Sequence, residues 1–159
     1  MKTPEYYGDL ARDLFTEGYN CSQSVSGAFS ELLDMDRAKI MRIASPFGGG
    51  MGRMREVCGC VSGMYMVLGW LYGYDDPQAY EDKKQLYARV QELAEAFRTD
   101  NGSIICRELL GEQGKDHSSV PEQRTEAYYK KRPCKELAAY TARLLANYIQ
   151  EHPYGRIDL

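Results

Sequence analysis

The sequence predicts an all-α fold: a single compact multi-helix domain with a central Gly-rich buried helix. Apolar residues recur at helical spacing along nearly all of the 159 residues, and no long stretch alternates apolar and polar residues as a strand does. Helix-starting and helix-ending residues also punctuate the chain throughout. Because neither a repeat nor an interdomain linker is present, residues 1–159 are expected to form one helical domain.

The first third of the chain predicts three helices. Residues 3–5 supply an N-cap, a first-turn proline and an early acid, and Gly18 ends the first helix. A second helix begins near Asn20, and a third begins at Asp36 and stops at Pro46. The apolar positions expected to face the core in the second and third helices are Val25, Ala28, Phe29, Leu32, Ile40 and Ile43.

The centre of the chain is a stretch without charge. Residues 57–74 are 18 uncharged positions, at the lower edge of the roughly 20 needed for a membrane span. They include four glycines, and charged residues flank them on both sides, so a buried helix is favoured and no membrane association is expected. Gly59 and Gly63 lie four residues apart, a spacing that allows close helix packing in the core or, alternatively, along a homodimer seam.

The second half predicts one long helix followed by shorter elements. Residues 75–77 cap the long helix, which runs to about Arg98 before Gly102 breaks the pattern. Polar residues at 111–120 are expected to form a surface loop. The remaining predicted helices are a short turn at 106–110, a helix from Pro121 through Tyr129, and a last helix from Cys134 to about Glu151.

Composition limits which binding partners and which cellular compartment are expected for the protein. Lys and Arg number 20 against 23 Asp and Glu, a net charge of −3, which gives no basic face for nucleic acid. The first residues lack the apolar segment of a signal peptide, so a cytoplasmic location with reduced thiols is expected. Five cysteines cannot all pair internally, and cysteines in that setting are more often metal ligands or redox groups than structural disulfides.

Four cysteines share one local context. Cys21, Cys58, Cys106 and Cys134 each start a predicted helix and lie three or four residues before an apolar residue. A helix N-terminus favours the thiolate, so four such starts gathered at one end would form a redox or metal-ligating site. Cys60 follows Cys58 by two residues and would face nearly the opposite way on a helix, so it is assigned to packing and kept as a secondary candidate.

A glycine loop precedes Cys58 and is expected to shape the site. It contains Gly48, Gly49, Gly50 and Gly52 and continues into Arg53, while Gly59 and Gly63 follow in the helix. These glycines permit a tight turn and a close approach of Cys58 to neighbouring backbone. Nucleotide binding is disfavoured because the Lys-Ser/Thr of a P-loop and a preceding strand are both absent, although Arg53 and Arg55 leave an anion site open.

These residues resemble the bacterial and archaeal redox-active family known by its cysteine pattern, C_GCAxxG_C_C. The matching segments are residues 18–25, residues 47–63, Cys106 and Cys134, and the resemblance covers roughly residues 5 to 150. Either Cys58 or Cys60 matches the family's cysteine, and the helical-face argument favours Cys58. The resemblance implies a redox role; a related domain in split-Soret cytochromes accompanies haem with an iron–sulfur centre. The chain has no Cys-x-x-Cys-His, which argues against covalent haem.

Three functions remain open from sequence. The first is a redox or electron-transfer protein whose cysteines 21, 58, 106 and 134 ligate an iron–sulfur cluster. The second is metal-free thiol–disulfide chemistry by a pair of the same cysteines, and the third is a helical interaction module with structural cysteines. The sequence identifies neither the redox partner nor whether the chain is an enzyme.

Overall fold

The computed structural model describes residues 1–155, and the all-α fold is confirmed. Within those residues the only β-structure is a single antiparallel bridge between Val57 and Ile105. The elements in chain order are α1 (Pro4–Glu17), α2 (Cys21–Ala28), α3 (Arg37–Ala44), the 3-10 turn η1 (Ser45–Phe47), α4 (Gly48–Met51), α5 (Gly59–Tyr72), α6 (Tyr80–Asn101), α7 (Cys106–Leu110), the 3-10 turn η2 (Gly111–Gly114), α8 (Glu126–Lys131) and α9 (Cys134–Glu151).

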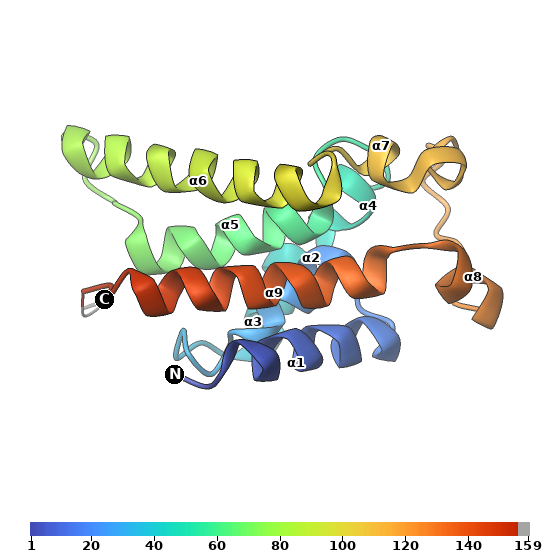
Figure 1. Ribbon diagram of the computed structural model, residues 1–159, viewed down its shortest axis with the longest axis horizontal. Coiled ribbons are helices and arrows are strands. Elements are labelled where there is room, and N and C mark those ends of the chain that lie inside the picture. The colour runs from blue at the N-terminus through green and yellow to red at the C-terminus, as the bar shows by residue number, and fades with distance from the viewer. Residues whose placement is uncertain (156–159) are drawn as a thin grey trace.

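The long helices lie side by side, and one end of the stack collects the helix starts. In Figure 1, α9 lies between α1 and α5, and α6 covers the other side of α5. Helix α1 runs toward the right-hand end, where α2 follows it, and α5 and α9 both begin at that same end. The short elements α4, α7 and α8 cluster there as well. This arrangement brings cysteines that are far apart in sequence toward one region.

The predicted helix signals of the N-terminal third are present. The side chain of Thr3 accepts a hydrogen bond of 3.2 Å from the backbone N–H of Tyr6, and Gly18 ends α1 in the left-handed conformation with φ 115°. Asn20 and Gln23 form a reciprocal capping box at the start of α2, with both bonds at 3.0 Å. These caps satisfy backbone groups that a helix end leaves free, and they fix where α2 begins.

Three predicted details are wrong. Helix α6 begins at Tyr80 and continues to Asn101. Its start is later than expected because the residues expected to cap it form a separate turn, in which the side chain of Asp76 accepts a hydrogen bond of 2.8 Å from the N–H of Gln78. Helix α8 begins after Thr125, whose side chain caps it, and not at Pro121. Ile43 is 58% exposed, because Met41 and Ala44 are the α3 positions that face the core beside Ile40.

Helix α5 is buried against α2, and its glycines set the distance. A Cβ on Gly59 would lie 3.0 Å from the Cβ of Cys21, and one on Gly63 would lie 2.6 Å from the carbonyl oxygen of Ser22. Only a hydrogen at these positions lets the two backbones approach so closely. Among residues 1–155, no helix combines the length and apolar character that a membrane crossing requires.

Candidate functional site: a thiol-lined cavity

Four cysteine side chains line one cavity of about 270 Å³ at the end of the stack where the helices begin. They are Cys21, Cys58, Cys106 and Cys134. The predicted convergence of these thiols is therefore present, although their chemical role stays a prediction. All five cysteines of the chain are free thiols; Cys21 is partly exposed and the other four are buried.

Each of the four lies at a helix start, as expected. Cys21, Cys106 and Cys134 are the first residues of α2, α7 and α9, and Cys58 is the N-cap of α5. Two backbone hydrogen bonds tie the segment before α5 to the start of α7: Cys58 N–H donates to Ile104 at 2.8 Å, and Cys106 N–H donates to Glu56 at 2.6 Å. These bonds and the bridge between Val57 and Ile105 hold Cys58 beside Cys106.

The glycine loop is a left-handed turn against these two cysteines. Residues 49–53 have φ values of 65°, 70°, 63°, 60° and 69°, and Arg55 has φ 61°. A Cβ on Gly50 would lie 2.6 Å from the Cβ of Cys106, and one on Gly48 would overlap the side chain of Asn20 at 2.4 Å. The left-handed conformation costs a non-glycine residue about 1–2 kcal/mol, so the loop holds strain at Met51 and both arginines. Backbone strain of this kind concentrates at functional sites.

Cys60 packs in the core, as expected, and its thiol also neighbours those of Cys21 and Cys58. Cys58 is the N-cap with extended backbone (φ −52°, ψ 131°) and Cys60 is the second residue of α5, so the argument from helical divergence does not apply to this pair. The thiol of Cys60 is fully buried and hydrogen-bonds to Cys21 and Cys58, which raises its pKa well above the ordinary thiol value. Cys60 is not among the residues that line the cavity.

Cys21 is the thiol whose ionised form the site stabilises. Hydrogen bonds from the thiols of Cys134 and Cys60 lower the pKa of Cys21 well below its ordinary value, and the positive charge of Arg124 adds to this effect against the cost of burial. Hydrogen bonding to the charged form is a recognised cause of a lowered pKa. Cys21 is also the one cysteine residue of the five that is partly exposed, and its lowered pKa favours the nucleophilic thiolate.

The expectation that every helix start favours a thiolate is wrong for two of the four. Burial raises the pKa of Cys106 to about 11. The hydrogen bond to Cys21, together with burial, raises the pKa of Cys134 well above its ordinary value. Desolvation and the sharing of protons within the cluster therefore outweigh the helix dipole at these positions.

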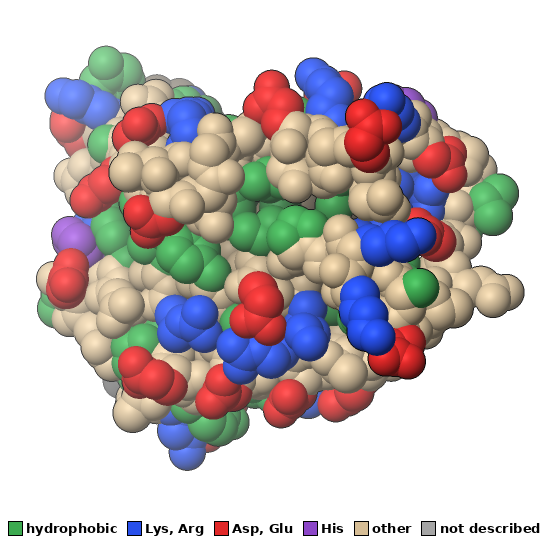
Figure 2. Space-filling model, turned by 45° about the vertical axis from the view of Figure 1, so that its right-hand side comes forward, with side chains coloured by type: hydrophobic (Ala, Val, Ile, Leu, Met, Phe, Trp, Pro, Cys, Tyr) green, Lys and Arg blue, Asp and Glu red, His purple; other side chains and the backbone are tan. Residues whose placement is uncertain are grey.

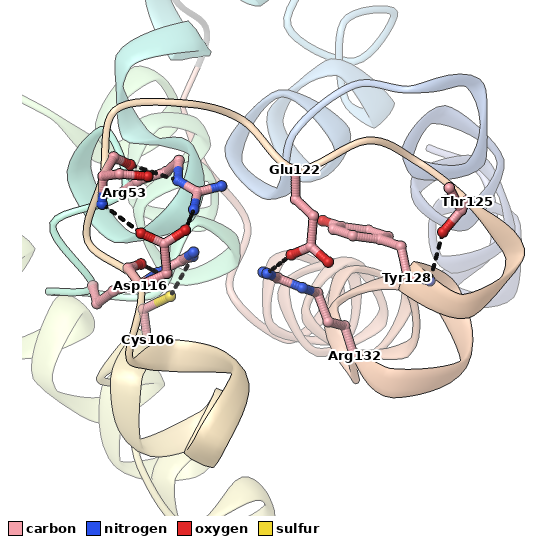
Figure 3. Close-up of polar contacts among 9 residues, drawn as sticks. Arg53, Cys106, Asp116, Glu122, Thr125, Tyr128 and Arg132 are labelled. Atoms are coloured by element: carbon pink, nitrogen blue, oxygen red, sulfur yellow. Dashed lines mark hydrogen bonds and ion pairs between the residues drawn. The ribbon is translucent and has the colours of Figure 1, made fainter.

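Two arginines of the loop hold the segment that crosses the cavity mouth. Arg53 donates to the carboxylate of Asp116 and to the carbonyl oxygen of Ser118, both at 2.8 Å. Arg55 donates through Nε to the carbonyl oxygen of Asp116 at 3.0 Å, and its Nη1 lies 3.9 Å from the Sγ of Cys106. Figure 3 shows Arg53, Asp116 and Cys106 grouped on one side of this segment.

The far wall of the cavity comes from residues 121–132, which sequence reasoning did not select. Tyr128 is only 8% exposed, so its ring forms part of the buried side of this wall. The guanidinium carbons of Arg124 and Arg132 lie 4.8 and 4.7 Å from the centre of the Tyr128 ring, and Arg132 pairs with Glu122 beside that ring (Figure 3). Two arginines, one inside the helix expected from Pro121 and one just after it, are the only sequence signal for this wall.

The donor set does not form a site for a single metal ion. Across residues 1–155, no group of three or more histidine, cysteine or acidic side chains is arranged to hold one. The chemistry of the four cavity thiols nevertheless matches the Cys₄ donor set of iron–sulfur clusters.

Comparison with known proteins places the chain by its family. The sequence profile described as "Putative redox-active protein (C_GCAxxG_C_C)" matches residues 19–148, a range that includes all five cysteines. No curated protein and no solved structure matches the chain.

Proposed function

The chain belongs to the redox-active C_GCAxxG_C_C family, and on that premise we propose that it acts by thiol–disulfide exchange through Cys21 and Cys134. One observation carries the proposal: the partly exposed Cys21 and the buried Cys134 line the same cavity, and they are near enough for the Cys134 thiol to lower the pKa of Cys21. A nucleophile with a neighbouring resolving thiol is the minimum machinery for such exchange.

The exchange balances within the two cysteines and a substrate disulfide. The thiolate of Cys21 attacks one substrate sulfur, and the other sulfur leaves as a thiolate. Cys134 then attacks the Sγ of Cys21 in the mixed disulfide, gives its proton to solvent and releases the second substrate thiolate. The substrate disulfide is reduced to two thiols, while two protein thiols are oxidised to one disulfide; the reverse reaction uses the same groups.

An iron–sulfur cluster is the second candidate, favoured by the four thiols that line one cavity at positions 21, 58, 106 and 134. These cysteines would hold the cluster as thiolates, and a bound cluster would supply one-electron transfer. Positive charge beside the thiols, from the buried Arg55 and the partly exposed Arg124, would offset the negative charge that such a group carries.

Anaerobic purification followed by counts of iron, acid-labile sulfide and free thiols separates the candidates. The exchange function predicts protein without iron or sulfide that loses two thiols on mild oxidation and regains them on reduction. Iron and sulfide at the stoichiometry of a cluster would replace the first candidate with the second. Five thiols that resist mild oxidation in metal-free protein would reject both candidates in favour of a structural role.

A further inference from the structure

The thiol cavity contains more positive than negative charge. Four arginines and one glutamate are among its lining residues: Arg53, Arg55, Arg124, Arg132 and Glu122. Two of these arginines are neutralised, since Arg53 pairs with Asp116 and Arg132 pairs with Glu122. Arg55 and Arg124 have no carboxylate within 4.0 Å among the described residues and donate instead to backbone carbonyl groups. The thiolate of Cys21 offsets the charge near Arg124.

Arg55 is the buried arginine without an ion pair of its own, because the nearby carboxylate of Asp116 is paired with Arg53. It is only 1% exposed, and its Nη2 is a buried donor without a hydrogen-bond partner. Only three such buried side-chain atoms occur in residues 1–155, and two of them, Arg55 Nη2 and Arg132 Nε, belong to arginines of this cavity. A buried charge without a partner is costly, and the left-handed backbone at Arg55 adds strain to the same residue. Both costs fall on a position that borders the reactive thiols.

From this we propose, on the basis of the exchange function, that the substrate is a small disulfide that bears a carboxylate, and that Arg55 pairs with that anionic group. Arginine presents a planar fork of donors that matches a carboxylate. The ligand's negative charge would supply the counter-ion that Arg55 lacks and would bring the disulfide into the cavity that Cys21 lines. Neutral and cationic disulfides of the same size would lose this attraction.

Charge-matched alkylating reagents test the anion site without any redox step. Iodoacetate and iodoacetamide both transfer their carbon to a thiolate with loss of iodide, but only the first is anionic. The rates of alkylation at Cys21 by the two reagents are measured by peptide mass spectrometry. At low salt, we expect the ratio of the iodoacetate rate to the iodoacetamide rate to be on the order of tenfold higher in the folded protein than in the urea-unfolded protein. The excess should shrink as ionic strength rises.

Variants that remove a positive or a negative charge from the cavity separate the effect of charge from an effect on folding. Arg55→Gln should bring the ratio down toward that of the unfolded protein, and Arg55→Lys should retain part of the excess. Glu122→Gln removes the negative charge beside Arg132 and should raise the ratio; it answers the question even if Arg55→Gln fails to fold. The matched control is Arg98→Gln on α6, which breaks an exposed pair with Glu95 and should leave the ratio unchanged. A wild-type ratio equal to the unfolded one, or indifference to Glu122→Gln, would overturn the site.

Three disulfides of similar size then test the substrate class. Dithiodiglycolate is anionic, 2-hydroxyethyl disulfide is neutral and cystamine is cationic. Their leaving thiols differ in reactivity, so each exchange rate is divided by the rate with the urea-unfolded protein, and we expect these ratios to fall in that order. Equal ratios for all three would refute the anionic substrate while leaving the exchange function intact. Failure of all three to react, with alkylation still favouring iodoacetate, would instead refute the exchange function and leave the anion site standing.

Discussion

Replacing Gly63 by alanine tests whether the close approach of α2 to α5 builds the thiol cluster. The new Cβ would lie 2.6 Å from the carbonyl oxygen of Ser22, a backbone atom that moves only if α2 moves. Ser22 follows Cys21 directly, so its displacement carries Cys21 away from Cys60 on α5. Losing that hydrogen bond should raise the pKa of Cys21, because Cys60 is one of the two thiols that lower it.

Gly69 on the same helix supplies the matched control. It is exposed, and a Cβ there meets nothing within 4 Å, so Gly69→Ala should stabilise the protein by the helix-propensity gain of about 1 kcal/mol. Gly63→Ala has the same gain but adds an overlap that costs about 1–3 kcal/mol. Urea unfolding should therefore separate the two variants by about 1–3 kcal/mol, and thiolate titration by ultraviolet absorbance should show a raised Cys21 pKa in Gly63→Ala alone. Equal stabilisation by both changes, with an unaltered Cys21 titration, would refute this reasoning.

The same contacts predict the sign of three other effects, on the pKa of Cys21, on stability and on the pH dependence of stability. Cys60→Ala should raise the pKa of Cys21 and slow its alkylation near neutral pH, which a titration of alkylation rate against pH would show; unchanged kinetics would return Cys60 to a packing role. Met51→Gly should stabilise the protein by about 1–2 kcal/mol in urea because it relieves a left-handed non-glycine residue with φ 63°; a loss of stability would argue against strain there. The lowered pKa of Cys21 stabilises the folded protein fully above pH 9.0, the ordinary thiol pKa, and this contribution is lost as pH falls through the pKa of Cys21 in the folded protein. The raised pKa of Cys106 has the opposite effect: it stabilises the folded protein fully below pH 9.0, and this contribution is lost as pH rises through about 11. Unfolding of Cys21→Ser and Cys106→Ser across pH would check both signs, and identical pH profiles for the two variants would contradict them.

Local sequence signals predicted the helix starts well because each depends on a few neighbouring residues. The caps at Thr3 and Asn20 and the break at Gly18 act within one turn, so they are visible without the fold. The same signals misplaced the start of α6, because Asp76 uses its capping capacity in a separate turn. The start of α6 was therefore misplaced because one polar side chain can cap a helix or close a turn.

The candidate site was predictable only in part, since it is assembled from long-range contacts. The shared placement of four cysteines at helix starts predicted that they converge, and the cavity contains them all. The role of Cys60 was missed because the periodicity argument assumed that Cys58 lies inside the helix, whereas it is the N-cap. The positive wall from Arg124 and Arg132 was missed because nothing in residues 121–132 indicates that the segment folds back over α1 and α9.

Disulfide mapping after limited oxidation tests directly whether Cys21 and Cys134 are the exchanging pair. The reduced, metal-free protein is treated with a stoichiometric amount of a small disulfide, its remaining thiols are blocked at acidic pH, and its peptides are identified by mass spectrometry. Exchange through this pair predicts one disulfide between Cys21 and Cys134. The other three cysteines, Cys58, Cys60 and Cys106, should be found blocked as free thiols. A disulfide between Cys58 and Cys106, or five free thiols after treatment, would contradict it.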